Sequence, residues 1–418
     1  MKILSLFSGI GAFEKAFDHL KIPYELVGYC EIDKYASKSY SAIHNVPESM
    51  NLGDITKVDE KALPKDMDLI TYGFPCQDIS LAGKQKGLFN EDGTQTRSGL
   101  FFEALRIIEE TQPRVAIAEN VKNLTGKTFK EQFKIVLDSL EQAGYNNYWK
   151  VLNAKDFGIP QNRERVFIVS IRQDIDTECF EFPEGFPLEL RLKDILEAEV
   201  DEKYYLSDKP FIVTDNNSVK VREATKTGYA EAVEGDSINL EQPNSKTRRG
   251  RVGKQVAQTL TTTPQQAVIE PMALDEQNGY IRKDGCVGTL TTDGSSPKHN
   301  NRVVQTDLRI RKLTPKECFR LMGFDDSDFE KAEAVNSNTQ LYKQAGNSIV
   351  VSVVEYIIKE LCACGVFEAN KPIAKTRKAS AEQLMYVEIS ANMSADDVKA
   401  LNAFFRSRDI PKTHYVIH

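Results

Sequence analysis

The sequence predicts an α/β protein whose main domain is a doubly wound sheet, with a smaller, mostly β or irregular domain and a short C-terminal α+β extension. Residues 2–20 combine an apolar run, a glycine turn and an apolar face of helical period, which is the first unit of a doubly wound fold. Short apolar runs at 68–72 and 114–118 each end in polar residues, as buried strands do. From about 184 to 302 these periodicities fade into short polar runs rich in Thr, Gly, Asn and Gln.

The composition is that of a water-soluble globular protein. The 418 residues, 28% charged and 41% hydrophobic, leave room for roughly two to four domains. No apolar run approaches the roughly 20 residues of a membrane span, and the N-terminal run is interrupted at Gly9 and Gly11, unlike a signal peptide. The seven cysteines lack framework spacing and fit a reducing compartment, so we expect a cytoplasmic protein.

Charge and cysteine spacing restrict the possible partners. A net charge of −7 gives no global attraction to nucleic acid, so such a partner must meet a local basic patch. One candidate patch is Lys246–Lys254, where five basic residues and no acid fall within nine positions. This patch can contact phosphates, and a solvated basic loop is the alternative. Cys362 and Cys364 have no matching Cys or His pair, so no metal site is expected.

The first two predicted strands have the pattern of a cofactor site. The first leads through Gly9 and Gly11 into a helix, and glycines let a backbone approach a ligand while a helix N-terminus offers free N–H groups. The second ends at Glu31, 20 positions after Gly11, where an acid is expected to accept a ribose hydroxyl of an adenosine cofactor. Asp54 and Ile55 follow in a loop that could receive the adenine amino group. Any tight βα turn can carry two glycines, so these residues alone do not decide.

A cysteine lies at the edge of the sheet where ligands bind. The apolar run 68–72 breaks at Gly73 and Pro75 and delivers Cys76 onto the loop beyond the strand's carboxyl end. Such a thiol can be a nucleophile, although a lone cysteine is more often a small buried apolar residue.

Two later segments carry charged groups toward the same edge. The strand predicted at 114–121 contains Glu119 near its end, and Arg163 and Arg165 alternate just before another apolar strand, so both point to one side of it. A guanidinium near a thiol favours the thiolate, which matters because an ordinary cysteine has a pKa of about 8.5. An acid that closes a strand is otherwise simply solvated at the sheet rim.

The remaining segments are loops and helices. Residues 80–97 form a polar, glycine-bearing loop of the kind that often closes over active sites, with a tolerated insertion as the alternative; a helix follows at 98–110. Thr314-Pro-Lys-Glu317 is a capping box that starts a helix ending at Gly323. A final helix follows Asn347 and Ser348.

In their order and spacing, the motifs resemble those of the DNA cytosine-5 methyltransferases. Several motifs in the same order are more specific than any one of them, and the resemblance covers about 1–183 and 303–368. The motifs are Phe7-Ser-Gly-Ile-Gly11, Gly73-Phe-Pro-Cys-Gln77, Glu119-Asn-Val121, Gln161-Asn-Arg-Glu-Arg165, Leu313–Phe324 and Gln344-Ala-Gly-Asn-Ser348.

The resemblance implies a domain organisation. A Rossmann-like, doubly wound S-adenosylmethionine-dependent methyltransferase domain is expected at 1–183 and 303–368. A target-recognition domain is expected at 184–302, followed by a linker at 369–380 and an extension of unknown role at 381–418.

The resemblance also implies a reaction. A methyl group passes from S-adenosylmethionine to carbon 5 of a cytosine flipped out of a specific duplex DNA sequence. The Cys76 thiolate would attack carbon 6, and Glu119 would stabilise the resulting charge at the N3 edge of the base. Arg165, and Arg163 less directly, would hold the base carbonyl and the neighbouring phosphate.

Site residues follow from the same motifs. The catalytic set is Cys76, Glu119, Arg163 and Arg165. The cofactor-binding set is Phe7, Gly9, Gly11, Glu31, Ile32, Asp54, Ile55, Pro75, Leu100, Asn347 and Ser348. The DNA-contact set is Gln77, Ser80, Arg97, Arg248, Arg249, Arg251, Thr259 and Thr289; either Thr259-Leu or Thr289-Leu could be the family's Thr-Leu pair in the recognition domain.

Some residues depart from the family pattern. Ile32 stands where an aromatic residue often stacks on adenine, Asp78-Ile79 stand where a bulkier aromatic residue is expected, and 90–95 lengthen the loop. An RNA cytosine-5 methyltransferase and a catalytically silent DNA-binding relative are the alternatives. The separate recognition segment favours duplex DNA, and the intact Cys, Glu and Arg set favours turnover. We expect a monomeric modification enzyme of a restriction–modification system or a phage.

Overall fold

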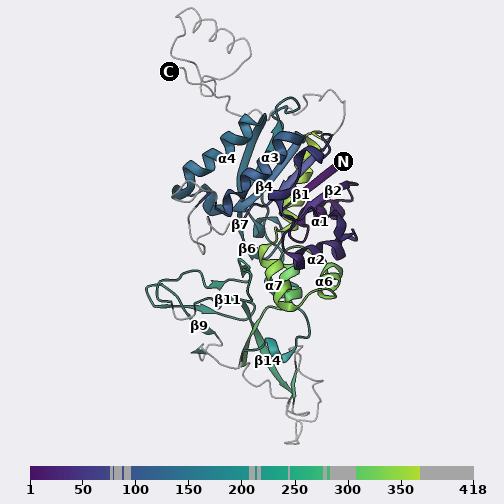
Figure 1. Ribbon diagram of the computed structural model, residues 1–418. Coiled ribbons are helices and arrows are strands. Elements are labelled where there is room, and N and C mark those ends of the chain that lie inside the picture. The colour runs from purple at the N-terminus through teal and green to yellow at the C-terminus, as the bar shows by residue number, and fades with distance from the viewer. Residues whose placement is uncertain are drawn as a thin grey trace, which may run out of the picture. The chain divides into compact units, whose positions relative to one another are not determined.

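A computed structural model of the protein describes residues 1–75, 79, 87–88, 96–206, 212–213, 218–242, 245–275, 280–282 and 307–367 (Figure 1). The chain divides into two compact units, Met1–Ala369 and Asn370–His418. The described residues belong to the first unit, so the expected linker at 369–380 and the extension at 381–418 lie outside them. No helix in the described part of the chain is long and apolar enough to cross a bilayer.

The first unit contains a mixed six-stranded sheet with the strand order β2-β1-β3-β4-β7-β5. Strands β1 to β4 are parallel, whereas β7 is antiparallel to both β4 and β5. The predicted first four strands are confirmed, but β5 was not predicted because it is an edge strand with mostly half-buried residues. The bounds are Lys2–Leu6 (β1), Glu25–Cys30 (β2), Leu69–Tyr72 (β3), Val115–Val121 (β4), Tyr145–Asn153 (β5) and Glu164–Arg172 (β7).

Helices cover both faces of this sheet. Alternate residues of β4 belong to two apolar clusters: Val115 and Ile117 share one with α1 and α8, and Ala116 and Ala118 share the other with α3 and α4. The alternation follows from the two-residue period of a strand. The helices are Ala12–Leu20 (α1), Lys34–His44 (α2), Phe101–Thr111 (α3), Lys130–Gln142 (α4), Pro315–Arg320 (α5), Asp326–Glu333 (α6), Asn338–Asn347 (α7) and Val351–Ala363 (α8).

The middle of the chain forms smaller antiparallel sheets. One has the order β10-β9-β8, and the other has the order β12-β11-β14-β15 with β16 beside β14. Because β16 pairs with β14, residues 307–312 share a sheet with the middle segment, although the expected boundary lay at 302. The bounds are Ile212–Val213 (β8), Val219–Arg222 (β9), Tyr229–Ala232 (β10), Ser237–Asn239 (β11), Val252–Gly253 (β12), Gln266–Asp275 (β14), Tyr280–Arg282 (β15) and Asp307–Lys312 (β16).

A parallel strand pair joins the middle segment to the large sheet's loops. Strand β6, Gln161–Asn162, pairs with β13, Ala257–Gln258. The amide of Gln161 extends this contact, since its Oε1 accepts the N–H of Leu260 at 3.1 Å and its Nε2 donates to the carbonyl of Leu321 at 2.8 Å. The residues just before β7 are therefore fixed to two other parts of the chain.

The predicted capping box at the start of α5 is confirmed. The Oγ1 of Thr314 accepts the N–H of Glu317 at 3.1 Å, and Oε2 of Glu317 accepts the N–H of Thr314 at 2.8 Å. Pro315 occupies the first helical position, where its missing N–H has no intrahelical partner to lose.

A buried ion pair joins α5 to strand β16. The side chains of Arg311 and Glu317 are both fully buried, with Nη2 and Oε1 2.7 Å apart. The Nε of Arg311 also donates to Oε1 of Glu270 on β14 at 2.8 Å, and Oε1 of Glu317 accepts the N–H of Glu197 at 2.9 Å. Two charges removed from water are stable only when such bonds satisfy them, so this cluster is sensitive to the loss of either partner.

His19 on α1 contacts acids from two other segments. Its Nδ1 lies 2.7 Å from Oε1 of Glu355 on α8, and its Nε2 lies 3.2 Å from Oδ2 of Asp325, the residue before α6. The hydrogen bond to Glu355 raises the pKa of His19 above 6.5, and burial opposes this shift. The protonated imidazole therefore stabilises the folded protein.

This pairing predicts a pH-dependent contribution to stability. Because the pKa of His19 is raised on folding, its contribution is complete below the unfolded value of about 6.5 and is lost as the pH rises through the folded value. We expect the difference in unfolding free energy between the wild type and His19→Asn to shrink as the pH rises from about 6 past neutrality. Urea unfolding at a series of pH values measures this difference, and a constant difference would contradict the assignment.

Candidate active site

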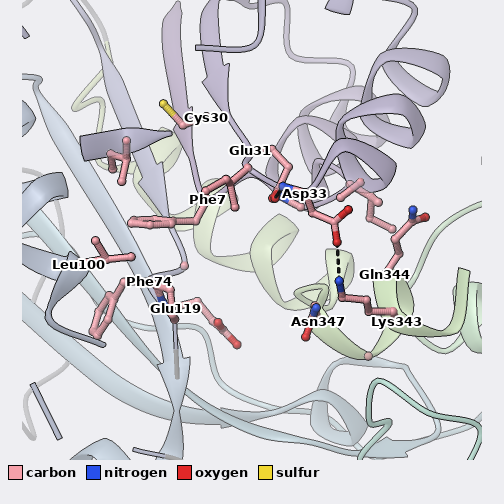
Figure 2. A pocket seen from close by; sticks show the side chains of 18 of the residues that line it. Phe7, Cys30, Glu31, Asp33, Phe74, Leu100, Glu119, Lys343, Gln344 and Asn347 are labelled. Carbon is pink, nitrogen blue, oxygen red and sulfur yellow. Dashed lines mark hydrogen bonds and ion pairs between the residues drawn. The ribbon is translucent and has the colours of Figure 1, made fainter. Parts of the chain in front are cut away.

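A cavity of about 270 Å³ opens at the carboxyl ends of β1, β2, β3 and β4 (Figure 2). Carboxyl ends of parallel strands meet at one edge of a sheet, which brings residues from distant parts of the chain together. The predicted site residues that line it are Phe7, Gly9, Glu31, Ile32, Asp54, Ile55, Pro75, Leu100, Glu119, Arg163, Arg165 and Asn347. The lining residues that were not predicted are Ile10, Cys30, Asp33, Ala36, Gly53, Gly73, Phe74, Val121, Lys343, Gln344 and Gly346.

The turn after β1, at Phe7 and Gly9, lies at the cavity wall. Phe7 and Gly9 both have left-handed backbone, with φ of 52° and 58°. A Cβ at Gly9 would meet no atom within 4 Å, so the turn leaves open space at this lining residue. For Phe7 the conformation costs on the order of 1 kcal/mol, which is typical of a ligand-binding turn.

Gly11, which was predicted to bind the cofactor, does not line the cavity and has a packing role. A Cβ at Gly11 would lie 2.1 Å from Nε2 of His44 and 2.9 Å from the ring of Tyr40. The same Nε2 lies 3.0 Å from the carbonyl oxygen of Ile10 and must donate to it, since a carbonyl only accepts. Gly11 therefore allows α2 to pack closely against the turn, and the sequence did not reveal this contact with His44.

Glu31 is oriented by two backbone donors. Its Oε2 accepts the N–H of Gly9 at 2.9 Å, and its Oε1 accepts the N–H of Asp33 at 2.7 Å. Burial raises the pKa of Glu31, and these two hydrogen bonds oppose the shift. Each oxygen keeps a second lone pair, so the carboxylate can still accept hydroxyl groups from a ligand.

Asp54 and Ile55, the second segment predicted to bind the cofactor, are held by hydrogen bonds to their own loop and to α3. The Oδ1 of Asp54 accepts the N–H of Thr56 at 3.1 Å and its hydroxyl at 2.9 Å. The carbonyl of Ile55 accepts from Nη2 of Arg106 at 3.1 Å. These bonds fix the position of the Asp54 carboxylate at the cavity wall.

Ile32 is an exposed apolar residue in the cavity wall. It is 77% exposed, although a large apolar side chain gains free energy when it is covered. Ile32 therefore presents an uncovered aliphatic surface at the cavity.

An ion pair at the rim joins two residues that are 310 positions apart in sequence. The Nζ of Lys343 on α7 lies 2.6 Å from Oδ2 of Asp33, and Asn347 lies near the same end of the cavity (Figure 2). Lys343 directly precedes the Gln344–Ser348 motif, so the sequence carried a signal for it. Asp33 had none, because its partner is distant in the chain.

Glu119 and Arg165 form the charged centre of the cavity. The Nε of Arg165 and Oε1 of Glu119 are 3.0 Å apart, and their side chains are 17% and 12% exposed. Burial raises the pKa of Glu119, with Arg165 and Arg163 opposing. The carboxyl can therefore hold a proton at a higher pH than an exposed glutamate does.

Cys76 lies outside the described residues, but the segments on either side of it are held in place. The buried Asn120, next to Glu119, donates through Nδ2 to the carbonyl of Phe74 at 3.0 Å. The Nδ2 of Asn123 donates to the carbonyl of Ile79 at 2.5 Å. Phe74 and Ile79, on either side of Cys76, are therefore anchored by the end of β4 and by the turn that follows it.

Arg163 tethers the backbone, which corrects its expected contacts with the base and the phosphate. Its buried guanidinium donates to the carbonyls of Leu260, Gly346 and Ser348 at 3.2, 3.0 and 2.7 Å. Ser348 in turn does not line the cavity, and its hydroxyl donates to the carbonyl of Ile349 at 3.2 Å. Ser348 therefore shapes the wall through its backbone.

The 259–262 segment packs directly against the cavity wall. A Cβ at Gly346 would lie 2.3 Å from the carbonyl oxygen of Thr261, so only glycine allows this approach. The Oγ1 of Thr259 donates to the carbonyl of Asn162 at 2.7 Å. Thr289, the other candidate, lies outside the described residues, as do Gln77 and Ser80.

The predicted basic patch is mostly occupied by internal contacts. The guanidinium of Arg251 is buried and donates to the carbonyls of 239, 241 and 242, so its assignment to DNA contact is wrong. Arg248 pairs with Glu241 at 2.5 Å. Arg249 and the separate Arg97 are exposed and stay available for a ligand.

Known proteins are similar to this chain in sequence and in fold. Residues 1–363 match the family model described as C-5 cytosine-specific DNA methylase. The chain is 37% identical to orphan methyltransferase M.SPRI of Bacillus phage SPR, over 86% of this chain and 97% of that protein. It is 35% identical to type II methyltransferase M2.ScrFI of Lactococcus lactis subsp. cremoris, over 86% and 99%. The solved structure of the Entamoeba histolytica methyltransferase EhMeth has a similar fold, with a TM-score of 0.54 and 17% identity over 87% of this chain and 98% of that one.

Proposed function

Because this chain belongs to the C-5 cytosine-specific DNA methylase family, we propose that its cavity binds S-adenosylmethionine beside a cytosine rotated out of duplex DNA. The protein is a DNA (cytosine-5-)-methyltransferase that uses S-adenosylmethionine. One observation carries the site assignment: the partly buried Glu119–Arg165 pair lines the same cavity as the turn at Phe7 and Gly9 and the acid Glu31.

The residues present fit the cofactor. Glu31 would accept the ribose hydroxyls through its remaining lone pairs, and Ile32 would cover one face of the adenine. Asp54 would accept the adenine amino group, and Asn347 would contact the methionine end. When bound, S-adenosylmethionine supplies an electrophilic methyl group on a sulfonium centre.

The protein must first make the cytosine a nucleophile. The Cys76 thiolate would form a carbon–sulfur bond at carbon 6 of the base, and the displaced electron pair would move toward N3. The proton held by Glu119 would neutralise the charge that develops at N3. Arg165 would orient both Glu119 and the base carbonyl.

Loss of two groups completes the reaction. Once carbon 5 carries the methyl group, N3 would return its proton to the Glu119 carboxylate, the carbon 5 proton would leave to a base, and the carbon–sulfur bond would break to restore the thiolate. Unstacking the base costs a few kcal/mol, which DNA contacts elsewhere on the protein must offset.

We assign target recognition to the middle segment. The pairing of β16 with β14 supports a recognition domain that extends to about 312, and the contact of Thr259 with Asn162 supports Thr259-Leu260 as the base-recognition pair. Arg249 and Arg97 would contact phosphates. By analogy with M.SPRI and M2.ScrFI, the enzyme would act as an orphan phage methyltransferase or as the modification partner of a restriction enzyme.

Methyl transfer to duplex DNA and trapping of the adduct test this proposal. A duplex with 5-fluorocytosine at the target position should form a stable covalent complex with the wild type, because the fluorine blocks the release step. Cys76→Ser should form no adduct and should lose more than about 10³-fold in rate, because a hydroxyl is a far weaker nucleophile. The variant should still bind S-adenosylmethionine. Methylation by Cys76→Ser at the wild-type rate would contradict the assigned nucleophile.

A further inference from the structure

We propose that Asn51 is a positioning residue that holds the two adenosine-binding segments, Glu31 and Gly53–Ile55, in register. The inference rests on the proposed function, since it assigns the residue a role in cofactor binding. Asn51 lies outside every motif identified in the sequence and does not itself line the cavity. Two of its hydrogen-bond partners, Glu31 and Gly53, do line it.

The amide of Asn51 uses its full hydrogen-bonding capacity. Its Oδ1 accepts the N–H of Glu31 at 3.0 Å and the N–H of Gly53 at 2.9 Å. Its Nδ2 donates to the carbonyl of Glu31 at 2.9 Å and to Oγ of Ser37 at 3.0 Å. A primary amide offers two donor hydrogens and two acceptor lone pairs, and all four are occupied here.

The side chain of Asn51 continues a strand pairing that its backbone begins. The backbone of Asn51 forms an isolated parallel bridge with Tyr29, and the N–H of Leu52 donates to the Tyr29 carbonyl at 2.7 Å. Beyond Cys30 the strand β2 ends, and the side-chain amide of Asn51 pairs with both backbone groups of Glu31 as a neighbouring strand would. The backbone of Glu31 is thereby held by Asn51, while its carboxylate is held by Gly9 and Asp33.

The contact with Gly53 couples the second segment to the first. Gly53 has left-handed backbone with φ of 74° and directly precedes Asp54. Because one oxygen of Asn51 accepts from both Gly53 and Glu31, a shift of either segment strains the bond to the other. A site that must fit both ends of one nucleoside needs such a fixed distance between its two acids.

The isosteric substitution Asn51→Asp tests this role. Aspartate keeps the size but loses both donors, and it directs an oxygen at the carbonyl of Glu31. We expect the Kd for S-adenosylmethionine and for S-adenosylhomocysteine, measured by calorimetry on the full chain, to rise by about tenfold or more. The rise should be equal for the two ligands, since they share the adenosine part. At saturating cofactor, kcat and the KM for DNA should stay within about threefold of the wild type.

A matched control separates positioning from general stability. Asn147 on β5, at the opposite edge of the same sheet, donates to the carbonyl of Leu137 at 3.1 Å and accepts from Ser170 at 2.6 Å. Asn147→Asp should lower the Tm without changing either Kd. A second variant, Asn51→Ser, removes the amide without adding charge and should raise both Kd values as Asn51→Asp does.

The outcomes are distinguishable. Wild-type affinity in both Asn51 variants, or an equal loss of affinity in Asn147→Asp, would overturn the inference. Failure of both Asn51 variants to fold would also overturn it, because the role assigned is local to the cavity. If the wild type bound neither S-adenosylmethionine nor S-adenosylhomocysteine, the proposed function itself would be wrong.

Discussion

Replacing Glu119 with glutamine is expected to lower the rate of methyl transfer by about 10²- to 10⁴-fold, the usual worth of a general acid. Glutamine keeps the size of the side chain and a carbonyl oxygen for Arg165, but it has no acidic proton to deliver at N3 of the base. Single-turnover rates with a target duplex measure the chemical step directly. Binding of S-adenosylmethionine and of duplex DNA should stay within about threefold of the wild type.

The pH dependence of the methyl-transfer rate is a second test of Glu119. Burial raises the pKa of Glu119, so the active protonated form persists to higher pH than for an exposed carboxyl and is lost as the pH rises through that pKa. The wild-type rate should therefore show a falling limb at higher pH, and Glu119→Gln should lack it. Glu164→Gln is the matched control, because Glu164 is a neighbouring acid that pairs with Lys122 outside the cavity at 2.7 Å. If Glu119→Gln transferred the methyl group at nearly the same rate as Glu164→Gln, the role assigned to Glu119 would be refuted.

Replacing Arg311 with methionine is expected to destabilise the protein by about 3–5 kcal/mol, because the fully buried carboxylate of Glu317 would lose its counter-charge. Glu317→Gln should destabilise the protein less than Arg311→Met, since Glu270 remains as a counter-charge to the buried guanidinium. Urea unfolding at neutral pH measures the free energy. The double replacement Arg311→Met with Glu317→Leu should lower the free energy of unfolding by less than the sum of the two single replacements. The reason is that neither member of the ion pair then remains without the other.

A neighbouring arginine provides the control for this cluster. Arg309 lies on the same strand, and its Nη2 is 2.6 Å from Oε2 of Glu202, whose side chain is 63% exposed. Surface ion pairs contribute about 1 kcal/mol or less, so Arg309→Met should have a small effect. If Arg309→Met and Arg311→Met destabilised the protein equally, burial would not be the reason for the larger predicted loss.

Elements with a complete local pattern could be predicted from the sequence. The strand, turn and helix of residues 2–20 carry both periodicities, and the capping box at Thr314 is defined within four residues; both are present in the structure. Strand β5 could not be predicted, because an edge strand has no continuous apolar run.

Contacts between distant segments explain the other differences. Arg163 and Arg165 are alike in type and two positions apart, yet one binds three backbone carbonyls and the other binds Glu119. Arg251 was predicted to contact phosphate because the sequence does not show which residues lie near it in space. The carbonyls that accept from its guanidinium belong to residues 9 to 12 positions earlier in the chain. Asn51 gave no signal at all, because its function depends on a neighbour 20 positions earlier in the chain.

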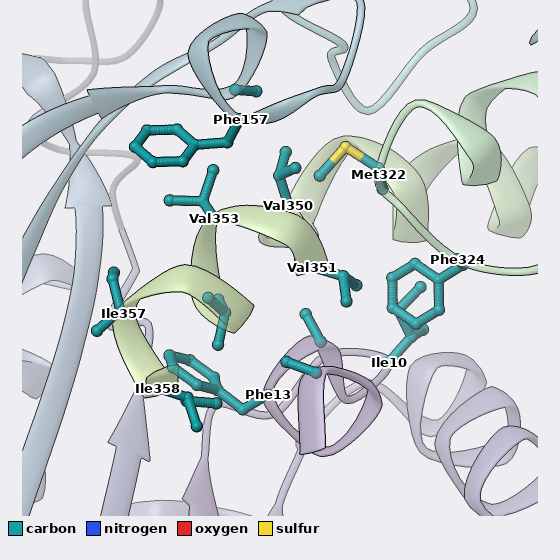
Figure 3. Packing of buried hydrophobic residues seen from close by; sticks show 14 of the residues in the cluster. Ile10, Phe13, Phe157, Met322, Phe324, Val350, Val351, Val353, Ile357 and Ile358 are labelled. Atoms are coloured by element: carbon teal, nitrogen blue, oxygen red, sulfur yellow. The ribbon is translucent and has the colours of Figure 1, made fainter. Parts of the chain in front are cut away.

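The rim ion pair between Asp33 and Lys343 has a consequence for biosynthesis. During translation the six sheet strands and their first helices leave the ribosome well before α7 and α8, yet α7 forms one wall of the cavity and α8 packs with Phe13 over the sheet (Figure 3). A nascent or prematurely terminated chain thus exposes an apolar sheet face and lacks a complete cofactor pocket. The cavity wall is therefore complete only when the chain has been synthesised to the end of α7.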